Sequence, residues 1–167
     1  MGDLIEGLKG VALFKGLSEE QIERVISIGR EVKWEEGETI CVEGEAGETI
    51  YIIYTGSVKV SKRLTLKGAG DEDDLSEKVL INMDAAEPIV VGEVAMLTKP
   101  ERSATITATK GCKALEIYGP DLGKLCETES ALGFTLMKNL ASILCDRLRQ
   151  VNYDVVRLAT ALTVALG

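Results

Sequence analysis

The most informative segment of this chain is Gly92-Glu93-Val94-Ala95-Met96-Leu97-Thr98-Lys99-Pro100-Glu101-Arg102-Ser103-Ala104. A Gly-Glu-Val-Ala turn can direct several backbone N–H groups at one anion. Nine residues after the acid, Arg102 carries a planar guanidinium that fits a phosphodiester with two parallel hydrogen bonds. Glu93 can only accept hydrogen bonds, which suits a sugar hydroxyl. Residues 92–104, called the cassette below, therefore predict a site for a phosphorylated sugar.

The cassette resembles the phosphate-binding segment of the cyclic nucleotide-binding domain family, which occurs in catabolite activator proteins and in regulatory subunits of cyclic AMP-dependent kinase. Family members carry Gly-Glu-aliphatic-Ala/Gly-Leu, then Pro-x-Arg or Pro-Arg and two small residues, and this chain keeps each of these elements. The resemblance implies cyclic AMP as the default ligand. A family hydroxyl at the position of Ser103 can also reach a guanine amino group, so cyclic GMP remains open. The implied ligand-binding residues are Gly92, Glu93, Val94, Ala95, Arg102, Ser103 and Ala104.

Upstream segments extend the resemblance over about residues 13–157. Short β-rich runs alternate with glycines at roughly 8 to 12 residue spacing, which favours a sandwich or barrel over a parallel sheet. We therefore expect a mainly β fold with flanking helices, a double-stranded β-helix (jelly roll) of about eight strands within residues 1–129. The apolar run 50–54 is expected to be buried, and separate strands are expected at 78–83, 88–91, 104–108 and 113–117.

Helices are predicted at both ends of the chain. Ser18 and Gln21 form the pattern of a capping box, which starts a helix that runs to about Gly29. Residues 130–167 have a helical apolar period, and a helix of that length is about 55 Å long, more than one small sandwich covers. Phe134 and Met137 are expected to pack on the sheet. A heptad seam comprises Leu144, Leu148, Val151, Val155, Leu158 and Leu162. We therefore predict a homodimer through residues 137–166, which is also the arrangement of the catabolite activator family.

Candidate purine contacts come from two regions. Met83 and Val91 are candidate pocket residues, although ordinary core packing explains them equally well. In catabolite activator proteins the long helix supplies polar contacts to adenine from both subunits, and Val151 and Asn152 occupy the matching positions here. An aliphatic residue thus replaces part of the polar pair. A solvent-facing role for Asn152 is at least as compatible with the sequence.

Composition restricts the classes of partner and cofactor. Nineteen basic against 27 acidic residues give 19 − 27 = −8, a charge poorly suited to nonspecific nucleic-acid binding. The four cysteines, Cys41, Cys112, Cys126 and Cys145, have no metal-like spacing, and the chain has no histidine, so no metal or cofactor is expected and the thiols are interpreted as buried. Residues 68–77 are interpreted as a solvated hairpin tip, with a calcium loop as the alternative. Without a recognisable signal peptide or an apolar run long enough to cross a bilayer, the predicted location is the cytoplasm, off the membrane.

These observations predict a regulatory sensor without catalytic residues. Binding of a cyclic nucleotide is expected to shift the population of long-helix positions and so to act on an effector. Two alternatives stay open: a dimerisation scaffold whose cassette is degenerate and holds no ligand, and the truncated sensory half of a DNA-binding transcription regulator. If the sensor does not act through a DNA-binding domain, it is expected to act on a protein effector.

Overall fold

The computed structural model describes residues 2–8, 10–65, 75–85, 88–98 and 101–166. The chain opens with α1 (Gly2–Leu8), the 3₁₀ helix η1 (Ala12–Phe14) and α2 (Glu19–Ser27). The strands of the described ranges are β1 (Gly29–Trp34), β2 (Thr39–Cys41), β3 (Thr49–Thr65), β4 (Leu75–Asp84), β5 (Ile89–Val91) and β6 (Thr105–Tyr118). The remaining helices are α3 (Glu93–Leu97), which follows β5, and α4 (Gly119–Thr128) and α5 (Ser130–Leu166), which follow β6.

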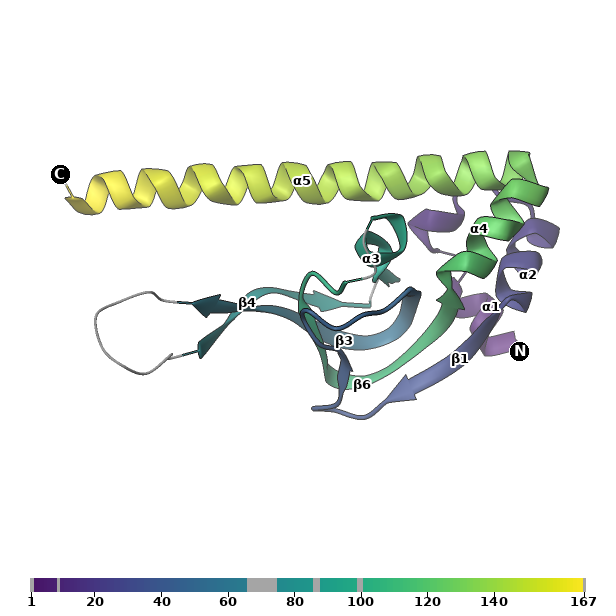
Figure 1. The fold of residues 1–167 in the computed structure, drawn as a ribbon, viewed down its shortest axis with the longest axis horizontal. Coiled ribbons are helices and arrows are strands. Elements are labelled where there is room, and N and C mark those ends of the chain that lie inside the picture. The colour runs from purple at the N-terminus through teal and green to yellow at the C-terminus, as the bar shows by residue number, and fades with distance from the viewer. Residues whose placement is uncertain (1, 9, 66–74, 86–87, 99–100, 167) are drawn as a thin grey trace.

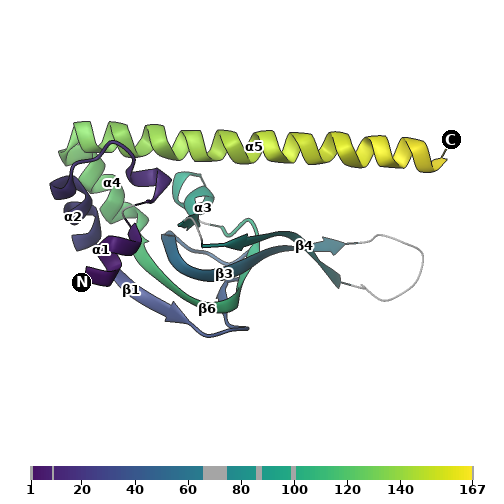
Figure 2. The same ribbon diagram turned by 180° about the vertical axis from the view of Figure 1, so that it is seen from behind.

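The strands form one antiparallel sheet in the order β1-β6-β3-β4. β2 also pairs with β6 and β5 with β3, so the long strands β3 and β6 join the sheet together. Figures 1 and 2 show α1, α2 and α4 gathered at one end of the curved sheet, while α5 runs across it and continues beyond. The β3–β4 hairpin projects in the same direction as the distal half of α5. A mainly antiparallel β fold with flanking helices is what the sequence predicted.

The expected number of strands was too high, because the described residues form six strands rather than about eight. The runs 104–108 and 113–117 are parts of the single strand β6, and β3 likewise continues through Gly56. Gly56 has a φ of 95°, and the pairing of β3 with β6 shifts register on both sides of it. An extra residue at such a bulge bends a strand without ending it. Gly56, one of the glycines between the β-rich runs of the sequence, thus marks a bend within a strand and not the end of one.

β3 separates two hydrophobic cores. Ile50, Ile52 and Tyr54 face the helices and join a core that includes Leu115, Leu132 and Leu136. Tyr51 and Ile53 point to the opposite side, into a core inside the curved sheet. Because side chains alternate along a strand, a strand covered on both faces needs a continuous apolar run. The expected burial of residues 50–54 is therefore confirmed.

The predicted helix ends agree closely with the structure. Ser18 is the N-cap of α2, and its hydroxyl accepts from the Gln21 amide while the Gln21 side chain accepts from Ser18, which completes the capping box. The helix ends at Ser27, slightly before the expected Gly29. A Cβ at Gly29 would lie 2.6 Å from Leu115 Cδ1, so this glycine permits close packing of β1 on β6.

α5 packs on the sheet only through its first half. Leu132, Leu136 and Leu140 are buried in the helix-side core, and Asn139 donates to the carbonyls of Leu13 and Lys15 at 2.8 and 2.7 Å. Met137 is partly buried, as expected. The expectation for Phe134 was wrong: its side chain is 72% exposed, because it lies on the face of α5 opposite the buried leucines.

The acidic segment 68–77 falls largely in residues 66–74, outside the described residues, so neither of its two interpretations is tested. None of the described helices has an apolar stretch long enough to cross a bilayer. The four cysteines are free, and burial is confirmed for Cys41 and Cys112. Cys145 is exposed on α5, which corrects the expectation that all four thiols are buried.

Gly56→Ala is expected to lower the free energy of unfolding by about 2 to 4 kcal/mol. Alanine would have to adopt the left-handed φ, and its methyl group would lie 2.7 Å from Cys112 Sγ. Gly123→Ala in α4 is the control, because a Cβ there meets no atom within 4 Å. It should raise the stability by up to about 1 kcal/mol. Urea denaturation followed by circular dichroism measures both, and equal stabilities would contradict the tight bend.

Candidate ligand-binding site

Gly92 turns the chain from β5 into the short helix α3. Its φ is 86°, in the left-handed region. A Cβ at this position would lie 2.5 Å from the carbonyl oxygen of Thr49 and 2.6 Å from Arg102 Nη1. Both the backbone conformation and the close approach therefore require glycine here. The first backbone N–H groups of α3 follow directly, and such groups have no partner within their own helix.

Arg102 is held in one place by backbone atoms and an aromatic ring. Its Nη1 donates to the carbonyl oxygen of Thr49 at 2.8 Å, and its guanidinium lies 5.6 Å from the centre of the Tyr51 ring. A Cβ at Gly47 would lie 2.6 Å from Arg102 Nε, so this glycine makes room for the guanidinium. The residue is only 6% exposed, and no carboxylate among the described residues forms an ion pair with it. Burial of a cation without a paired acid is costly unless other polar groups replace its hydration.

Glu93 is buried as well, and its partner comes from the long helix. The residue is 4% exposed, and Arg147 Nη1 donates to Glu93 Oε1 at 2.6 Å. Arg147 Nη2 donates to the carbonyl oxygen of Val90, the middle residue of β5. One arginine side chain therefore joins α5 to both the cassette and the strand that leads into it. The two members of the motif thus differ, since Glu93 has a counter-ion and Arg102 has none among the residues that the structure describes.

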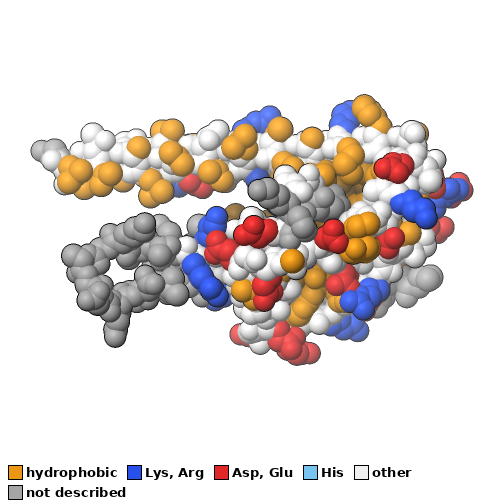
Figure 3. Space-filling model, viewed as in Figure 1, with side chains coloured by type: hydrophobic (Ala, Val, Ile, Leu, Met, Phe, Trp, Pro, Cys, Tyr) orange, Lys and Arg blue, Asp and Glu red, His pale blue; other side chains and the backbone are white. Residues whose placement is uncertain are grey.

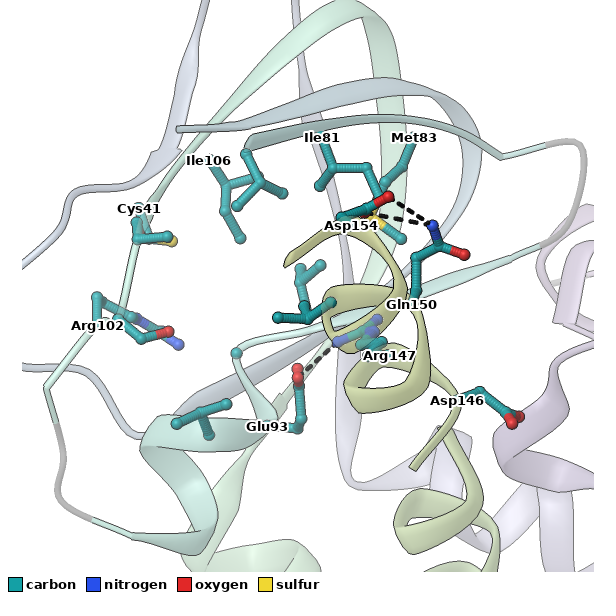
Figure 4. A pocket seen from close by; sticks show the side chains of 17 residues that line it. Cys41, Ile81, Met83, Glu93, Arg102, Ile106, Asp146, Arg147, Gln150 and Asp154 are labelled. Atoms are coloured by element: carbon teal, nitrogen blue, oxygen red, sulfur yellow. Dashed lines mark hydrogen bonds and ion pairs between the residues drawn. The ribbon is translucent and has the colours of Figure 1, made fainter. Parts of the chain in front are cut away.

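Arg102 and Glu93 line one cavity of about 440 Å³ between the sheet, α3 and α5. This volume lies within the usual range for small-molecule sites. In Figure 4, Glu93 and Arg147 face each other, Arg102 lies on one side, and Ile81 and Met83 lie on the other. The full lining is Cys41, Val60, Ile81, Met83, Val91, Gly92, Glu93, Val94, Arg102, Ser103, Ala104, Ile106, Asp146, Arg147, Gln150, Val151 and Asp154. The end of the cavity at Arg102 and Glu93 is thus charged, and the end at Ile81 and Met83 is mostly apolar.

The structure brings most of the residues singled out from the sequence to this cavity. Those that line it are Gly92, Glu93, Val94, Arg102, Ser103 and Ala104 from the cassette, together with Met83, Val91 and Val151. Ala95 belongs to α3, and its side chain lies outside the described part of the structure. Asn152 is exposed and is not among the lining residues, because successive residues of a helix point about 100° apart and Val151 already faces the cavity.

Sequence reasoning missed two groups of lining residues. The polar ones, Arg147, Gln150 and Asp154, lie on one face of α5 with Val151, at spacings of three and four. That spacing was a usable signal. The apolar ones include Val60 and Ile106, which face each other across the β3–β6 pair although they are 46 residues apart (106 − 60). Only the strand register places them together, so no local pattern could have identified them.

Cys41 contributes an uncharged wall beside Arg102. Burial raises the pKa of its thiol, with a smaller opposing effect of the Arg102 charge, so the group is a neutral thiol at pH 7. It therefore does not compensate the charge of Arg102. The described residues contain no group of three or more histidine, cysteine or acidic side chains arranged to hold a metal ion.

Comparison with known proteins identifies the class to which this site belongs. The family model of the cyclic nucleotide-binding domain matches residues 31–129, which is more than half of the chain and includes the whole cassette. The chain therefore belongs to the cyclic nucleotide-binding domain family, as the cassette motif had suggested.

Individual relatives point the same way. The cyclic AMP receptor protein of Thermus thermophilus is 26% identical over 148 residues, which cover 89% of this chain and 62% of that protein. The cAMP-dependent protein kinase regulatory subunit of Dictyostelium discoideum is 30% identical over 95 residues, 57% of this chain and 27% of the relative. This chain therefore spans less than two thirds of either protein.

Solved structures show the same fold. The catabolite activator protein of Thermus thermophilus superposes with a TM-score of 0.71 at 24% identity, covering 89% of this chain and 63% of that one. The regulatory domain of Toxoplasma gondii PKA, solved with cAMP, gives a TM-score of 0.59 at 27% identity, covering 74% and 43%. These likenesses support the jelly-roll fold expected from the sequence.

A double-mutant cycle measures the interaction energy between Glu93 and Arg147. Arg147→Ala should lower the free energy of unfolding by about 1 to 3 kcal/mol, because it leaves the buried Glu93 carboxylate without its donor. Glu93→Gln combined with Arg147→Ala should cost less than the sum of the two single changes. Arg149→Ala is the control, since Arg149 pairs with Asp146 on the exposed surface of the same helix. Additive effects of the two changes would show that the pair does not couple α5 to the cassette.

Proposed function

We propose that this chain is a non-catalytic sensor that binds a 3′,5′-cyclic nucleotide, with cyclic AMP favoured over cyclic GMP. The observation that carries the proposal is the buried guanidinium of Arg102, which lines a cavity without an acidic partner among the described residues. A singly charged phosphodiester would supply the missing negative charge. Similarity to a cyclic AMP receptor protein and to a kinase regulatory domain solved with cAMP supports the choice of adenine.

The cavity suggests how such a ligand would lie. The phosphate would contact Arg102 and the first N–H groups of α3, with the Ser103 hydroxyl beside it. The ribose hydroxyl would donate to Glu93, whose Oε1 already accepts from Arg147. The purine would then extend toward the apolar end, formed in part by Met83 and Ile81. Recognition of this kind requires no nucleophile and no general base, which agrees with a regulatory role.

Coupling to the long helix follows from the shared carboxylate. Glu93 accepts from Arg147 of α5 and would also accept from the ligand, so occupancy would change the energy of the helix position. A ligand shifts such an equilibrium only by its differential affinity for the two positions. The output would pass to a protein effector or a further domain. The cytoplasm remains the proposed location, because the four free cysteines favour a reducing compartment.

Titration calorimetry with cyclic AMP and cyclic GMP tests whether the cassette binds a cyclic nucleotide. Arg102→Ala should weaken binding by on the order of 2 to 5 kcal/mol, because it removes the charge that meets the phosphate. Arg30→Ala is the matched control, since Arg30 is exposed on β1 and pairs with Glu116 outside the cavity. If Arg102→Ala and Arg30→Ala bind like the wild type, the cassette does not hold the phosphate. If the wild type binds neither nucleotide yet is dimeric, the scaffold alternative is favoured.

A homodimer through residues 137–166 is the second part of the proposal. The distal half of α5 leaves the sheet, and Figure 3 shows apolar side chains along it. The seam residues Leu148, Val151, Val155, Leu158 and Leu162 are each 55–66% exposed. In a parallel coiled coil with this seam, a residue flanking it on one helix lies near the residue five positions later on the other. Asn152 of a second copy would then lie beside Arg147, at the edge of the nucleotide cavity.

Sedimentation velocity tests whether two copies of the chain associate through the seam. Leu158→Asp should convert a dimer into a monomer at concentrations of about 10 µM, because it places a charge in the middle of an apolar interface. Val164→Asp is the control: this residue is 76% exposed and lies outside the seam. A wild-type protein that sediments as a monomer would contradict the proposed dimer. Equal dissociation by both variants would show an interface other than the seam.

A further inference from the structure

The guanidinium of Arg102 has a charge to be balanced and N–H groups that a ligand needs. A guanidinium presents five N–H donors, and in the part of the chain that the structure describes this one has a single hydrogen bond, to the Thr49 carbonyl. A carboxylate beside it would neutralise the charge, but would also occupy the paired N–H groups that bind a phosphate. A group that balances this charge and keeps the site open must therefore attract a cation without accepting its hydrogen bonds.

The ring of Tyr51 has this property. Arg102 Cζ lies 5.6 Å from the ring centre, within the range at which an aromatic ring attracts a cation. The attraction comes from the quadrupole of the ring, so it uses none of the N–H groups. Tyr51 is not among the residues that line the cavity, so its effect on a ligand would be indirect, through Arg102.

The Tyr51 ring is itself held by its neighbours. The residue is 8% exposed and pairs across the sheet with Val91 of β5 and Glu116 of β6. The ring of Trp34 lies against it, with the two centres 5.4 Å apart and the planes at 80°, the edge-to-face arrangement that aromatic pairs favour. A ring packed in this way has little freedom. It can therefore restrict the many rotamers of a long arginine side chain.

We propose that Tyr51 is a positioning residue of the phosphate site, an inference that rests on the proposed function. Its ring keeps the Arg102 guanidinium in the place where a phosphodiester meets it and leaves the N–H groups free to donate. Without the ring, the guanidinium would be free to leave this place, and ligand binding would have to order it again at a cost in affinity. Cyclic AMP and cyclic GMP carry the same phosphate, so both should be affected equally.

Titration calorimetry with both nucleotides on Tyr51→Phe and Tyr51→Leu tests the assignment. Tyr51→Phe keeps the ring and should bind each nucleotide within about twofold of the wild type. Tyr51→Leu removes the ring and should weaken both about tenfold, without a change in the ratio of the two affinities. Tyr54→Leu is the matched control, since Tyr54 lies on the same strand and is 6% exposed but faces the helix-side core. It should lower the stability and leave both affinities unchanged.

A change that preserves the shape of the ring separates its attraction for the cation from ordinary packing. A trifluorinated phenylalanine in place of Tyr51 has nearly the shape of phenylalanine, but its fluorine atoms withdraw electron density from the ring face that attracts the cation. It should bind both nucleotides several-fold more weakly than Tyr51→Phe. Equal or tighter binding would overturn the assignment. This variant also decides the question if Tyr51→Leu fails to fold.

The outcomes separate this inference from the function on which it rests. If Arg102→Ala weakens both nucleotides while Tyr51→Leu and the fluorinated ring bind like the wild type, the role of Tyr51 is wrong and the proposed function stands. An equal loss of affinity in Tyr54→Leu would show a general effect of destabilisation, which also overturns that role. If the wild type binds neither nucleotide, the proposed function and this inference fail together.

Discussion

The positive charge of Arg102, buried without an acidic partner in the described structure, is the constraint on which the rest of this site depends. Removing a cation from water is costly unless other groups replace the lost hydration. The Thr49 carbonyl and the Tyr51 ring replace part of it, and two glycines, Gly47 and Gly92, leave the guanidinium the space it occupies. The guanidinium also lines the cavity, where the proposed phosphate would supply the opposite charge.

The fold brings this charge and the long helix to the same cavity through β3. The strand pairs with β4, β5 and β6 and has a hydrophobic core on each face, so the positions of Thr49 and Tyr51 are fixed by packing on both sides. β5 pairs directly with this segment of β3 and delivers Glu93, while helix-side packing of Leu136 and Leu140 fixes where α5 passes. The Glu93–Arg147 pair is the point at which sheet and helix meet in the site.

Features that depend on nearby residues could be predicted from the sequence, and features that depend on long-range geometry could not. The capping box at Ser18 and the extent of α5 each depend on neighbours within a few positions, so the sequence was sufficient to predict them. The cassette motif was likewise sufficient to predict the family. The strand count failed because Gly56 bends a strand that its flanking residues keep paired. Phe134 was misplaced because the direction of α5 relative to the sheet is a tertiary property. The apolar wall of the cavity was missed for the same reason, since strand register alone brings its members together.

The uninterrupted course of α5 has a mechanical consequence. Arg147 lies near the middle of a 37-residue helix, with 19 residues (166 − 147) beyond it. That distal part is about 28 Å long, so a pivot of about 10° at the cassette would displace its tip by about 5 Å. The helix can therefore act as a lever arm that magnifies an ångström-scale rearrangement around one carboxylate into a displacement about as large as one helical pitch.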